Sequence, residues 1–444
     1  MIIKNYRQLC KTELRKNALD ILLAGIESVV PQNFMKKNIR FENGFLYVCN
    51  NKFTLRGKLY VIGGGKASGT MAEALEKIIP KQKITGGIVN AKTVARTSRI
   101  NVNIASHPLP DRRGLIGVQK MLEMTSNPKK EDIVICLISG GGSALMPDPA
   151  DGITLEELQK MTQIMIKCGA ETYELNMLRK HTSKLKGGNL ARLLQPATVI
   201  SFILSDVVNP NDVTASGPTE PDKTTFQQCY EVLEKYNLKK IPKSIVLHIK
   251  KGIRGKVPET VKPNEKFMKN VYNYVLADKN IALRAMGKKT VELGFKTEVL
   301  RSIIRGDVRT AAQKTAALLK KKYKNEDGAF ALVYSSENTV IVKGKGKGGR
   351  NQEYVACLIN EIKDFGNCVI ASSDSDGVDY LEGVGGAIAD SYSYNELKRL
   401  ELDINKFLIS NNTFELHKRL GNLIFMNPTD TNVGDLNVCL MLKS

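Results

Sequence analysis

The chain has 444 residues, 42% of them hydrophobic and 25% charged, and because one compact core rarely grows to this length, two domains are expected. No stretch approaches the roughly 18 to 20 uninterrupted apolar residues of a bilayer span, and the N-terminal residues lack the apolar segment of a signal peptide, which predicts a cytoplasmic protein. The formal net charge of +21 suits an enzyme for anionic substrates better than a nucleic-acid-binding protein, because the lysines are spread over helices and loops without interleaved aromatic residues.

Strands and helices are predicted to alternate along the chain. Residues 6–30 carry apolar residues at helical spacing and predict an amphipathic helix. Short runs rich in β-branched residues follow, and they are apolar throughout, as strands covered on both faces are. These predicted strands span residues 58–62, 86–90, 133–139 and 197–205, and helical patterns follow several of them. The first part of the chain therefore predicts a doubly wound parallel sheet of the α/β class.

Residues 251–267 combine charge, glycine and proline with few apolar residues, and they predict a linker. Domains are accordingly expected at residues 1–251 and 268–444. Five further runs predict the strands of a second, smaller α/β domain, at residues 270–278, 330–335, 339–342, 368–373 and 436–442. Because ligands bind beyond the carboxyl ends of strands in α/β sheets, the loops after these runs are where chemistry is expected.

The turn at residues 61–69, VIGGGKASG, leaves a strand and opens a helix. Free backbone N–H groups and the helix dipole favour an anion at such a turn, and Lys66 adds a positive charge. A P-loop is excluded, because it would need glycine at Tyr60 and serine or threonine at Ala67. The dinucleotide fingerprint fails too, because Ser68 takes the third glycine position and no carboxylate ends the next strand. A tight turn with a solvated lysine is the structural alternative.

A second glycine turn, SGGGSALM at residues 139–146, follows the most apolar strand of the chain. Its consecutive amides and the hydroxyls of Ser139 and Ser143 are suitable donors to phosphate. A serine-hydrolase reading fails because the glycine spacing differs from GxSxG and no partner histidine is evident. A flexible turn without a ligand is the structural alternative.

A third group of polar residues spans 179–191 and the loop 205–222. Asp206 ends a predicted strand, where its carboxylate could hold Mg²⁺ or act on a substrate hydroxyl, because a hard cation prefers carboxylate oxygen. Asp212 and Ser216 are weaker candidates. Turns and helix caps use the same residue types, so a structural role is the alternative for each of them.

The second half repeats the combination of glycine and charge. In the loop 342–353, Arg350 could bind a carboxylate or a phosphoryl group through two parallel hydrogen bonds. Two acidic loops follow, with Asp374, Asp376 and Asp379 in the first and Asp430, Asn432 and Asp435 in the second. They are not EF-hands, because the twelfth position counted from Asp374 is Gly385. Anion-binding loops and acidic loops in both halves predict a ligand in a cleft between the domains.

These are the parts that phosphoryl transfer needs. The reaction demands little covalent chemistry from a protein, but it needs donor, acceptor and metal in line and cations around the transferred group. The catalytic-loop signatures of protein kinases are absent in usable context. The sequence thus predicts a small-molecule kinase of another kind.

Eight motifs in order resemble the glycerate 2-kinase family, whose C-terminal half is the MOFRL domain. They are GGGKAS (63–68), SHPLPD (106–111), SGGGSAL (139–145), NMLRKHTSKLKGGNLA (176–191), SDV with ASGPTEPD (205–222), GKGGRNQE (346–353), SDGVD (375–379) and NPTDTNVGD (427–435). The resemblance covers nearly the whole chain. It implies a Rossmann-like domain, a smaller MOFRL domain, and phosphorylation of D-glycerate to 2-phosphoglycerate by ATP and Mg²⁺, with other divalent ions acceptable.

The resemblance also implies roles for single residues. Lys66, Arg350 and Asp206 are expected to be catalytic, and Lys66, Ser68 and Arg350 to bind the substrate. Expected nucleotide-binding residues are Gly140, Gly141, Gly142, Ser143, Lys184 and Gly187. Asp206 and Asp376 are expected to hold the metal. The expected partners are D-glycerate and ATP, without nucleic acid or membrane, and a homodimer is left open.

Two departures from the family pattern bear on these roles. The usual SDVxGD reads SDVVNPND here, which puts Asp212 in doubt, and the usual DGxDG reads DGVDY with Tyr380, which puts the geometry after Asp379 in doubt. Members of the family also resemble hydroxypyruvate reductases. An NAD(P)H-dependent reductase is therefore the alternative function, disfavoured by the failed dinucleotide fingerprint.

Overall fold

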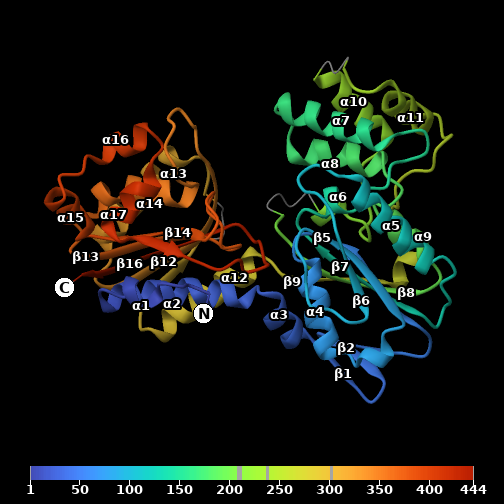
Figure 1. The fold of residues 1–444 in the computed structure, drawn as a ribbon, viewed down its shortest axis with the longest axis horizontal. Coiled ribbons are helices and arrows are strands. Elements are labelled where there is room, and N and C mark those ends of the chain that lie inside the picture. Colours follow the sequence, from blue (N-terminus) through green and yellow to red (C-terminus); the bar gives the residue numbers. More distant parts are fainter. Residues whose placement is uncertain (1, 208–212, 237–239, 301–303, 444) are drawn as a thin grey trace. The chain divides into compact units, whose positions relative to one another are not determined.

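The chain folds into two compact units, described by a computed structural model for residues 2–207, 213–236, 240–300 and 304–443 (Figure 1). The central unit comprises residues 31–276, and the terminal unit comprises residues 1–30 together with 277–444. Each unit has its own sheet and its own buried core.

The central unit is built on a six-stranded sheet with the strand order β6-β5-β4-β7-β8-β9. The strands are β4 (Leu59–Gly64), β5 (Gly86–Ala91), β6 (Ile100–Ile104), β7 (Ile133–Ser139), β8 (Thr198–Leu204) and β9 (Val271–Ala277). The pairings from β6 through β8 are all parallel. Every residue of β7 is buried, as expected of a central strand covered on both faces. The predicted doubly wound parallel sheet is confirmed.

Helices cover both faces of this sheet (Figure 1). The covering helices include α4 (Ser68–Ile78), α5 (Arg112–Met124) and α9 (Asn189–Leu193), and α3 (Pro31–Asn38) packs on α4. The chain enters the sheet at β4, adds β5 and β6 on one side, and then returns to add β7 and β8 on the other side. The strand order therefore reverses between β4 and β7, which is where ligands bind in open α/β sheets.

Two smaller parts complete the central unit. One is a layer of helices with its own apolar core, formed by α7 (Leu155–Lys167), α8 (Thr172–His181), α10 (Phe226–Lys235) and α11 (Lys243–Ile253). The other is an antiparallel sheet of β1 (Ile39–Glu42), β2 (Phe45–Val48) and β3 (Asn51–Thr54). The short helix α6 (Gly142–Leu145) follows β7.

The terminal unit has a mixed sheet of seven strands, with the order β10-β12-β16-β13-β14-β15 and β11 beside β12. The strands are β10 (Lys296–Val299), β11 (Ile304–Asp307), β12 (Gly328–Thr339), β13 (Asn367–Asp374), β14 (Val384–Asp390), β15 (Leu423–Phe425) and β16 (Asp435–Lys443). The helices are α1 (Tyr6–Leu9), α2 (Glu13–Ser28), α12 (Lys279–Glu292), α13 (Val308–Asn325), α14 (Arg350–Ile362), α15 (Ser393–Arg399), α16 (Ile404–Ile409) and α17 (Thr413–Leu420). The predicted second α/β domain is confirmed as an architecture.

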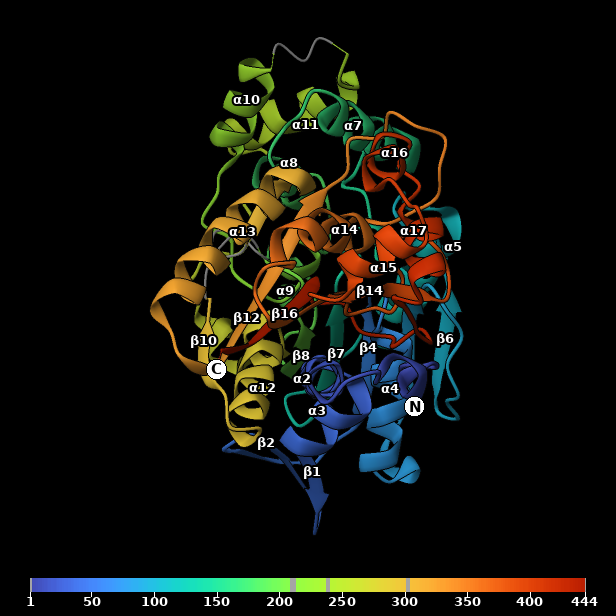
Figure 2. The same ribbon diagram turned by 90° about the vertical axis from the view of Figure 1, so that its left-hand side faces the viewer.

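The N-terminal helix belongs to the terminal unit, whereas the sequence placed residues 1–251 together. Helix α2 packs beside α12 on one face of the terminal sheet, and Figure 2 shows α2 nearly end-on. The buried guanidinium of Arg15 binds the Asp390 carboxylate at 2.6 Å and the Asn422 side chain at 3.0 Å. An amphipathic pattern predicts that a helix has a buried face, but not which sheet it covers.

The predicted linker at 251–267 is likewise part of the central unit. The amide of Val261 donates to Gly187 at 2.9 Å, and its carbonyl accepts from Asp222 at 2.7 Å. The strand expected to open the second domain is β9, which instead pairs with β8 at the edge of the central sheet. The composition correctly predicted an irregular segment. Its backbone hydrogen bonds with Gly187 and Asp222 nevertheless hold it against the central unit.

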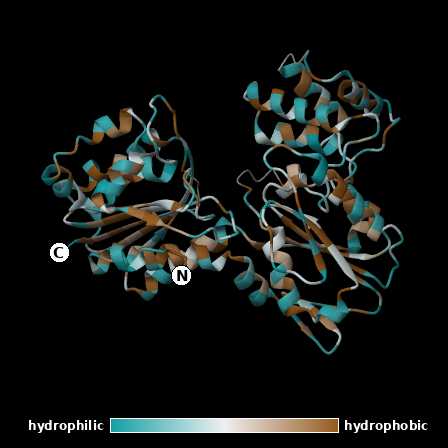
Figure 3. Ribbon diagram, in the orientation of Figure 1, coloured by the Kyte–Doolittle hydropathy of each residue, from teal (hydrophilic) through white to brown (hydrophobic). Residues whose placement is uncertain are grey.

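Apolar residues concentrate in the strands and on the inner faces of the helices of each unit (Figure 3). In the described ranges, none of the helices combines the length and the apolar character that a membrane span requires. The predicted short strand at 339–342 is wrong, because β12 is one strand that ends at Thr339. Its polar residues Ser335 and Ser336 are buried against β16, and they break the apolar run without ending the strand.

Candidate active site

The two predicted glycine turns lie side by side at the point where the strand order reverses. In the turn after β4, the amide of Lys66 donates a hydrogen bond to the carbonyl of Gly140 at 2.9 Å. The amide of Ala67 donates to the Ser139 hydroxyl at 3.0 Å. Two sequence motifs more than 70 residues apart therefore form one continuous backbone surface.

Glycine is required in both turns because the backbones approach closely. Gly65 has a φ of 155°, and a Cβ there would lie 2.1 Å from the Ser139 hydroxyl oxygen. A Cβ on Gly140 would lie 2.1 Å from a carboxylate oxygen of Asp206. Asp206, which follows β8, thus packs directly against the second turn, and three strand ends converge here.

Basic side chains lie near the turns. The ring of His107 and the Cγ atom of Lys66 lie 2.9 and 3.1 Å from where a Cβ on Gly141 would be. Burial lowers the pKa of His107 to about 4, and the charges of Lys66, Lys92 and Arg179 lower it in the same direction. His107 is therefore neutral at pH 7 in a positive local field.

Lys66 itself is half-buried, and within the described residues its ammonium pairs with no carboxylate. Helix α4 starts two residues later with an N-cap, Ala67, whose side chain makes no capping bond, and its first turn carries no acidic residue. A helix N-terminus and a neighbouring lysine without internal counter-charge form a place where an external anion is stabilised.

A strained loop supports the second turn from behind. Ala215 and Ser216 both have positive φ values, 56° and 59°, which non-glycine residues rarely adopt. The Ser216 hydroxyl lies 2.7 Å from the Ser143 hydroxyl and donates to the Asn176 side chain at 3.0 Å. Surrounding contacts must hold such a backbone in place, and residues of this kind gather at functional sites.

The other residues predicted in this half have structural partners. The buried hydroxyl of Ser68 donates to the carbonyl of Leu137 at 3.0 Å and so ties α4 to β7. The amide of Gly187 donates to Ser216 at 3.1 Å. Lys184 is exposed and forms an ion pair with Asp151 at 2.6 Å. The substrate contact of Ser68 and the nucleotide contacts of Lys184 and Gly187 stay predictions, and Asp212 lies outside the described residues.

In the terminal unit, Arg350 begins α14 and is held by carboxylates. Its Nε and Nη2 atoms donate to the two oxygens of Asp435 at 2.7 and 2.8 Å, and Nη2 also donates to Asp374. The two-bond geometry predicted for a substrate is thus occupied by Asp435. Burial raises the pKa of Asp374 to about 7 and that of Asp435 to about 6, while Arg350 opposes the rise.

Backbone N–H groups of this unit that could bind an anion are also satisfied internally. The carboxylate of Asp379 accepts the amides of Asn351 at 3.1 Å and Gln352 at 3.0 Å, at the N-terminus of α14. In the preceding glycine loop, the amides of Lys343 and Gly344 donate to the side chain of Asn411 at 2.8 and 2.9 Å. The predicted anion loop of the second half therefore carries its own acceptors.

The predicted metal ligands, Asp206 and Asp376, belong to different units. Asp376 accepts the amide of Val378 at 2.8 Å and the side chain of Asn432 at 3.4 Å. Over the described ranges, no three His, Cys, Asp or Glu side chains gather as a ready-made metal site. Mg²⁺ is commonly held by one or two carboxylates together with substrate phosphates, and the exposed Asp206 beside the glycine turn fits that arrangement.

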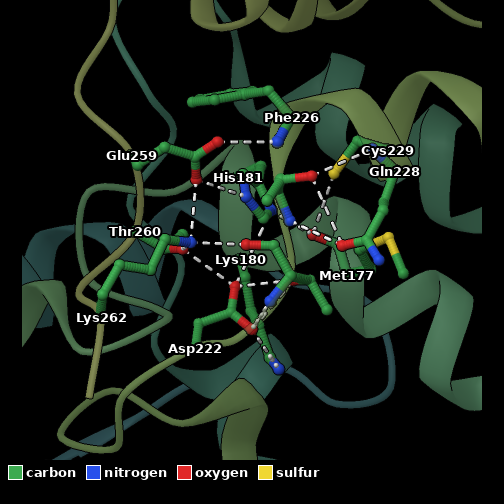
Figure 4. Close-up of polar contacts among 12 residues, drawn as sticks. Met177, Lys180, His181, Asp222, Phe226, Gln228, Cys229, Glu259, Thr260 and Lys262 are labelled. Atoms are coloured by element: carbon green, nitrogen blue, oxygen red, sulfur yellow. Dashed lines mark hydrogen bonds and ion pairs between the residues drawn. The ribbon is translucent and has the colours of Figure 1, made fainter. Parts of the chain in front are cut away.

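Behind the site, a buried polar cluster fixes α8 to the segment that was predicted as a linker (Figure 4). Lys180 binds Asp222 at 3.2 Å, and His181 binds Glu259 at 3.1 Å. Lys262 donates to Glu259 at 3.1 Å. Burial opposes ionisation of Glu259, but its hydrogen bonds with His181, Phe226 and Lys262 prevail and lower its pKa to about 2. The cluster holds α8 so that Asn176 faces the strained loop.

Comparison with known proteins identifies the family. A domain of unknown function, DUF4147, matches residues 17–250, and the MOFRL family matches residues 330–435. A glycerate 2-kinase of Pyrococcus horikoshii is 34% identical, over 97% of this chain and 98% of the relative. The crystal structure of a glycerate kinase from Thermotoga maritima is 30% identical and superimposes with a TM-score of 0.84, covering 97% of this chain and 99% of that one. The chain belongs to the glycerate 2-kinase family.

Two of the relatives found carry another name. A protein of Agrobacterium vitis is described provisionally as a hydroxypyruvate reductase, and it is 30% identical over 87% of this chain and 88% of its own length.

Sequence reasoning about this family member missed three groups at the site, namely His107, Arg179 and Lys186. All three lie in motifs that carried the resemblance, SHPLPD and NMLRKHTSKLKGGNLA, so their place in those motifs was the available signal. The second motif is rich in cations, and its sequence does not tell which of them are buried beside the glycine turn.

Proposed function

We propose that the protein is a glycerate kinase that transfers the terminal phosphoryl group of ATP to the 2-hydroxyl of D-glycerate. The observation that carries the proposal is the ammonium of Lys66, which forms no ion pair with any residue that the structure describes, beside two interlocked glycine turns at the reversal of strand order. The membership in the glycerate 2-kinase family supports the substrate, and the 2-position follows from the names of the relatives.

In this mechanism, the central unit binds the phosphates. The amides of residues 140–143 and the Lys66 ammonium would contact phosphoryl oxygens, whose negative charge spreads outward during transfer. Neutral His107 beside Gly141 adds a polar group without a second full charge. Fixed donors of this kind need no reorganisation as the charge develops.

Mg²⁺ would be held by Asp206 together with phosphate oxygens, and when bound it would neutralise charge on the transferred group. Asp206 lies at the end of β8 and packs on Gly140, so its carboxylate would sit next to the phosphate-binding turn. Asp376, which is bound by its own loop, is the weaker of the two proposed ligands.

Arg350 is proposed to hold the substrate carboxylate or the transferred group through Nη1. Its Nε and Nη2 atoms are committed to Asp435 and Asp374. These two carboxylates fix the plane of the guanidinium, which orients the remaining nitrogen.

The reductase alternative requires a dinucleotide, and the described residues oppose it. In dinucleotide-binding sheets, a carboxylate at the end of the second strand holds the ribose. Here that position is Asn90, which is fully buried and donates to the carbonyls of Gly114 at 2.8 Å and Leu145 at 2.6 Å. The Oδ1 atom of Asn90 accepts from the side chain of Asn103 at 2.8 Å, so the fold uses both ends of this amide.

Phosphorus NMR of the product formed from ATP, Mg²⁺ and D-glycerate tests reaction and position together. A phosphate on the 2-oxygen couples to one methine proton and gives a doublet, whereas a phosphate on the 3-oxygen couples to two protons and gives a triplet. The doublet is the expected result. The triplet would refute the position, and NADH consumption with hydroxypyruvate but no ADP release with glycerate would replace the kinase by the reductase.

A further inference from the structure

Lys186 is a buried cation in the loop between α8 and α9, with 4% of the residue exposed. Its ammonium donates to the carbonyl of Met146 at 2.8 Å. Within the described ranges this is its single hydrogen bond, and it has no ion pair. An ammonium has three N–H donors, and burying two of them unused is costly.

Lys180, in the same motif, shows what a structural buried lysine looks like here. It is 5% exposed and forms an ion pair with the buried carboxylate of Asp222 at 3.2 Å (Figure 4). Asp222 in turn accepts hydrogen bonds from Thr224 and Thr260. Lys180 therefore has a carboxylate in direct contact, whereas among the described residues Lys186 forms no ion pair and is only influenced by the nearby Asp148 carboxylate.

A cavity beside Lys186 is a place where an external anion could bind. It has a mixed lining, with apolar residues such as Pro147 and Met161 and, as polar residues, Ser143, Asp148, Thr162, Arg179, Thr182, Ser183 and Lys186. Ser143 belongs to the second glycine turn, so the cavity adjoins the candidate active site. Its interior offers about 20 Å³ to the centre of a water-sized molecule, which is room for one or two oxygen atoms but not for a nucleotide base.

The charges of this cavity favour an anion. Lys186 and Arg179 are the basic side chains of its lining, and Asp148 is its one carboxylate, whose pKa is raised by burial. Burial lowers the pKa of Lys186 to about 7, and Arg179 lowers it further, whereas Asp148 raises it. An oxyanion beside Lys186 would offset this loss of hydration and favour the charged ammonium.

We propose that Lys186 and Arg179 form a subsite for one oxyanion group of a substrate, either the carboxylate of the acid or a phosphoryl group of the nucleotide. This inference rests on the proposed kinase function, because it assigns part of the same site. The hydroxyls of Ser143, Thr182 and Ser183 line the subsite, and the anion would take the two unused N–H donors of Lys186.

The test compares Lys186→Met, which keeps the length of the side chain, with Lys160→Met on the exposed face of α7 as the control. Steady-state kinetics are measured with D-glycerate and ATP varied separately. We expect Lys186→Met to raise one KM at least tenfold and to leave the other within twofold, while Lys160→Met changes neither. A raised KM for glycerate assigns the carboxylate, and a raised KM for ATP assigns the phosphoryl group. A folded Lys186→Met protein with both KM values unchanged would overturn the subsite.

A binding measurement separates this inference from the proposed function. Thermal unfolding is followed with inorganic phosphate and with D-glycerate, both without ATP. We expect one of the two anions to stabilise the wild type and to lose that effect in Lys186→Met. Should the wild type release no ADP with glycerate, the kinase proposal fails, but this shift still decides the subsite. If Lys186→Met does not fold, Arg179→Met must show the same loss, and an undiminished shift in that variant overturns the subsite.

Discussion

The two units use similar residues in opposite ways. In the central unit, the glycine turns end at a helix without an acidic cap, and Lys66 has no carboxylate partner in the part of the chain that the structure describes. In the terminal unit, the N-terminus of α14 is capped by Asp379, and Arg350 is held by Asp374 and Asp435. A cationic side chain that pairs with no carboxylate of the protein can bind a ligand. A cationic side chain that is ion-paired with buried carboxylates is already part of a structural cluster.

This difference predicts that the two cations fail in different ways when they are removed. Arg350→Ala leaves two buried carboxylates without a counter-charge, so we expect a loss of about 3 kcal/mol in the free energy of unfolding as well as a loss of turnover. Urea unfolding at pH 7 measures it. Arg399→Ala, which breaks an exposed pair with Glu396, is the control and should change little. An Arg350→Ala protein as stable as the wild type would contradict the structural half of the comparison.

Lys66→Ala should instead spare stability and remove activity. We expect kcat to fall about 10²–10³-fold, because a preorganised charge at the transferred group is lost. Lys77→Ala, at the other end of α4, is the matched control, because the ammonium of this exposed lysine pairs with Glu73 at 2.8 Å. ADP release and thermal unfolding are measured together. Normal turnover in Lys66→Ala would remove this residue from the mechanism.

The buried carboxylates should make stability depend on pH. The pKa of Asp374 is raised to about 7, chiefly by burial, whereas an unfolded aspartate titrates near 4. Its contribution to stability is therefore complete below about pH 4, and it is lost as the pH rises through about 7, with a slope of at most about 1.4 kcal/mol per pH unit. Asp374→Asn should flatten the curve of unfolding free energy between pH 4 and 7. An identical slope in wild type and variant would reject this cause.

Asp206 should affect the metal requirement more than the fold. Asp206→Asn removes one carboxylate charge beside Gly140, and we expect the Mg²⁺ concentration for half-maximal activity to rise about tenfold, which corresponds to about 1.4 kcal/mol. Glu123→Gln, on the exposed side of α5, serves as the control. An unchanged Mg²⁺ titration would leave Asp206 with a purely structural role.

The sequence predicted the central sheet well because parallel strands covered on both faces must be apolar throughout, as β7 is. It predicted less of the terminal sheet. Strand β14 contains two glycines in the run VGGAIAD and was not recognised, because its stability comes from pairing with β13 and β15 and not from its own residues.

The candidate site was predictable in the same uneven way. Glycine turns and Lys66 were visible because backbone N–H groups at a strand end favour anions whatever the rest of the fold. The commitment of Arg350 to Asp435 and Asp374 was not visible, because these residues are 85 and 24 positions away along the chain. Nor could the motif at 176–191 tell that Lys180 forms a buried ion pair whereas Lys186 forms none with the residues that the structure describes.

By itself, the sequence determined the class of fold, the position of the anion-binding turns and the family, because periodicity and glycine spacing are local properties of the chain. Only the tertiary structure decided which sheet α2 packs on, which sheet β9 joins, and which charged side chains form ion pairs inside the protein. Charge pairing and burial depend on contacts between distant segments, so the same arginine or lysine becomes a structural tie or an open ligand site according to what packs against it.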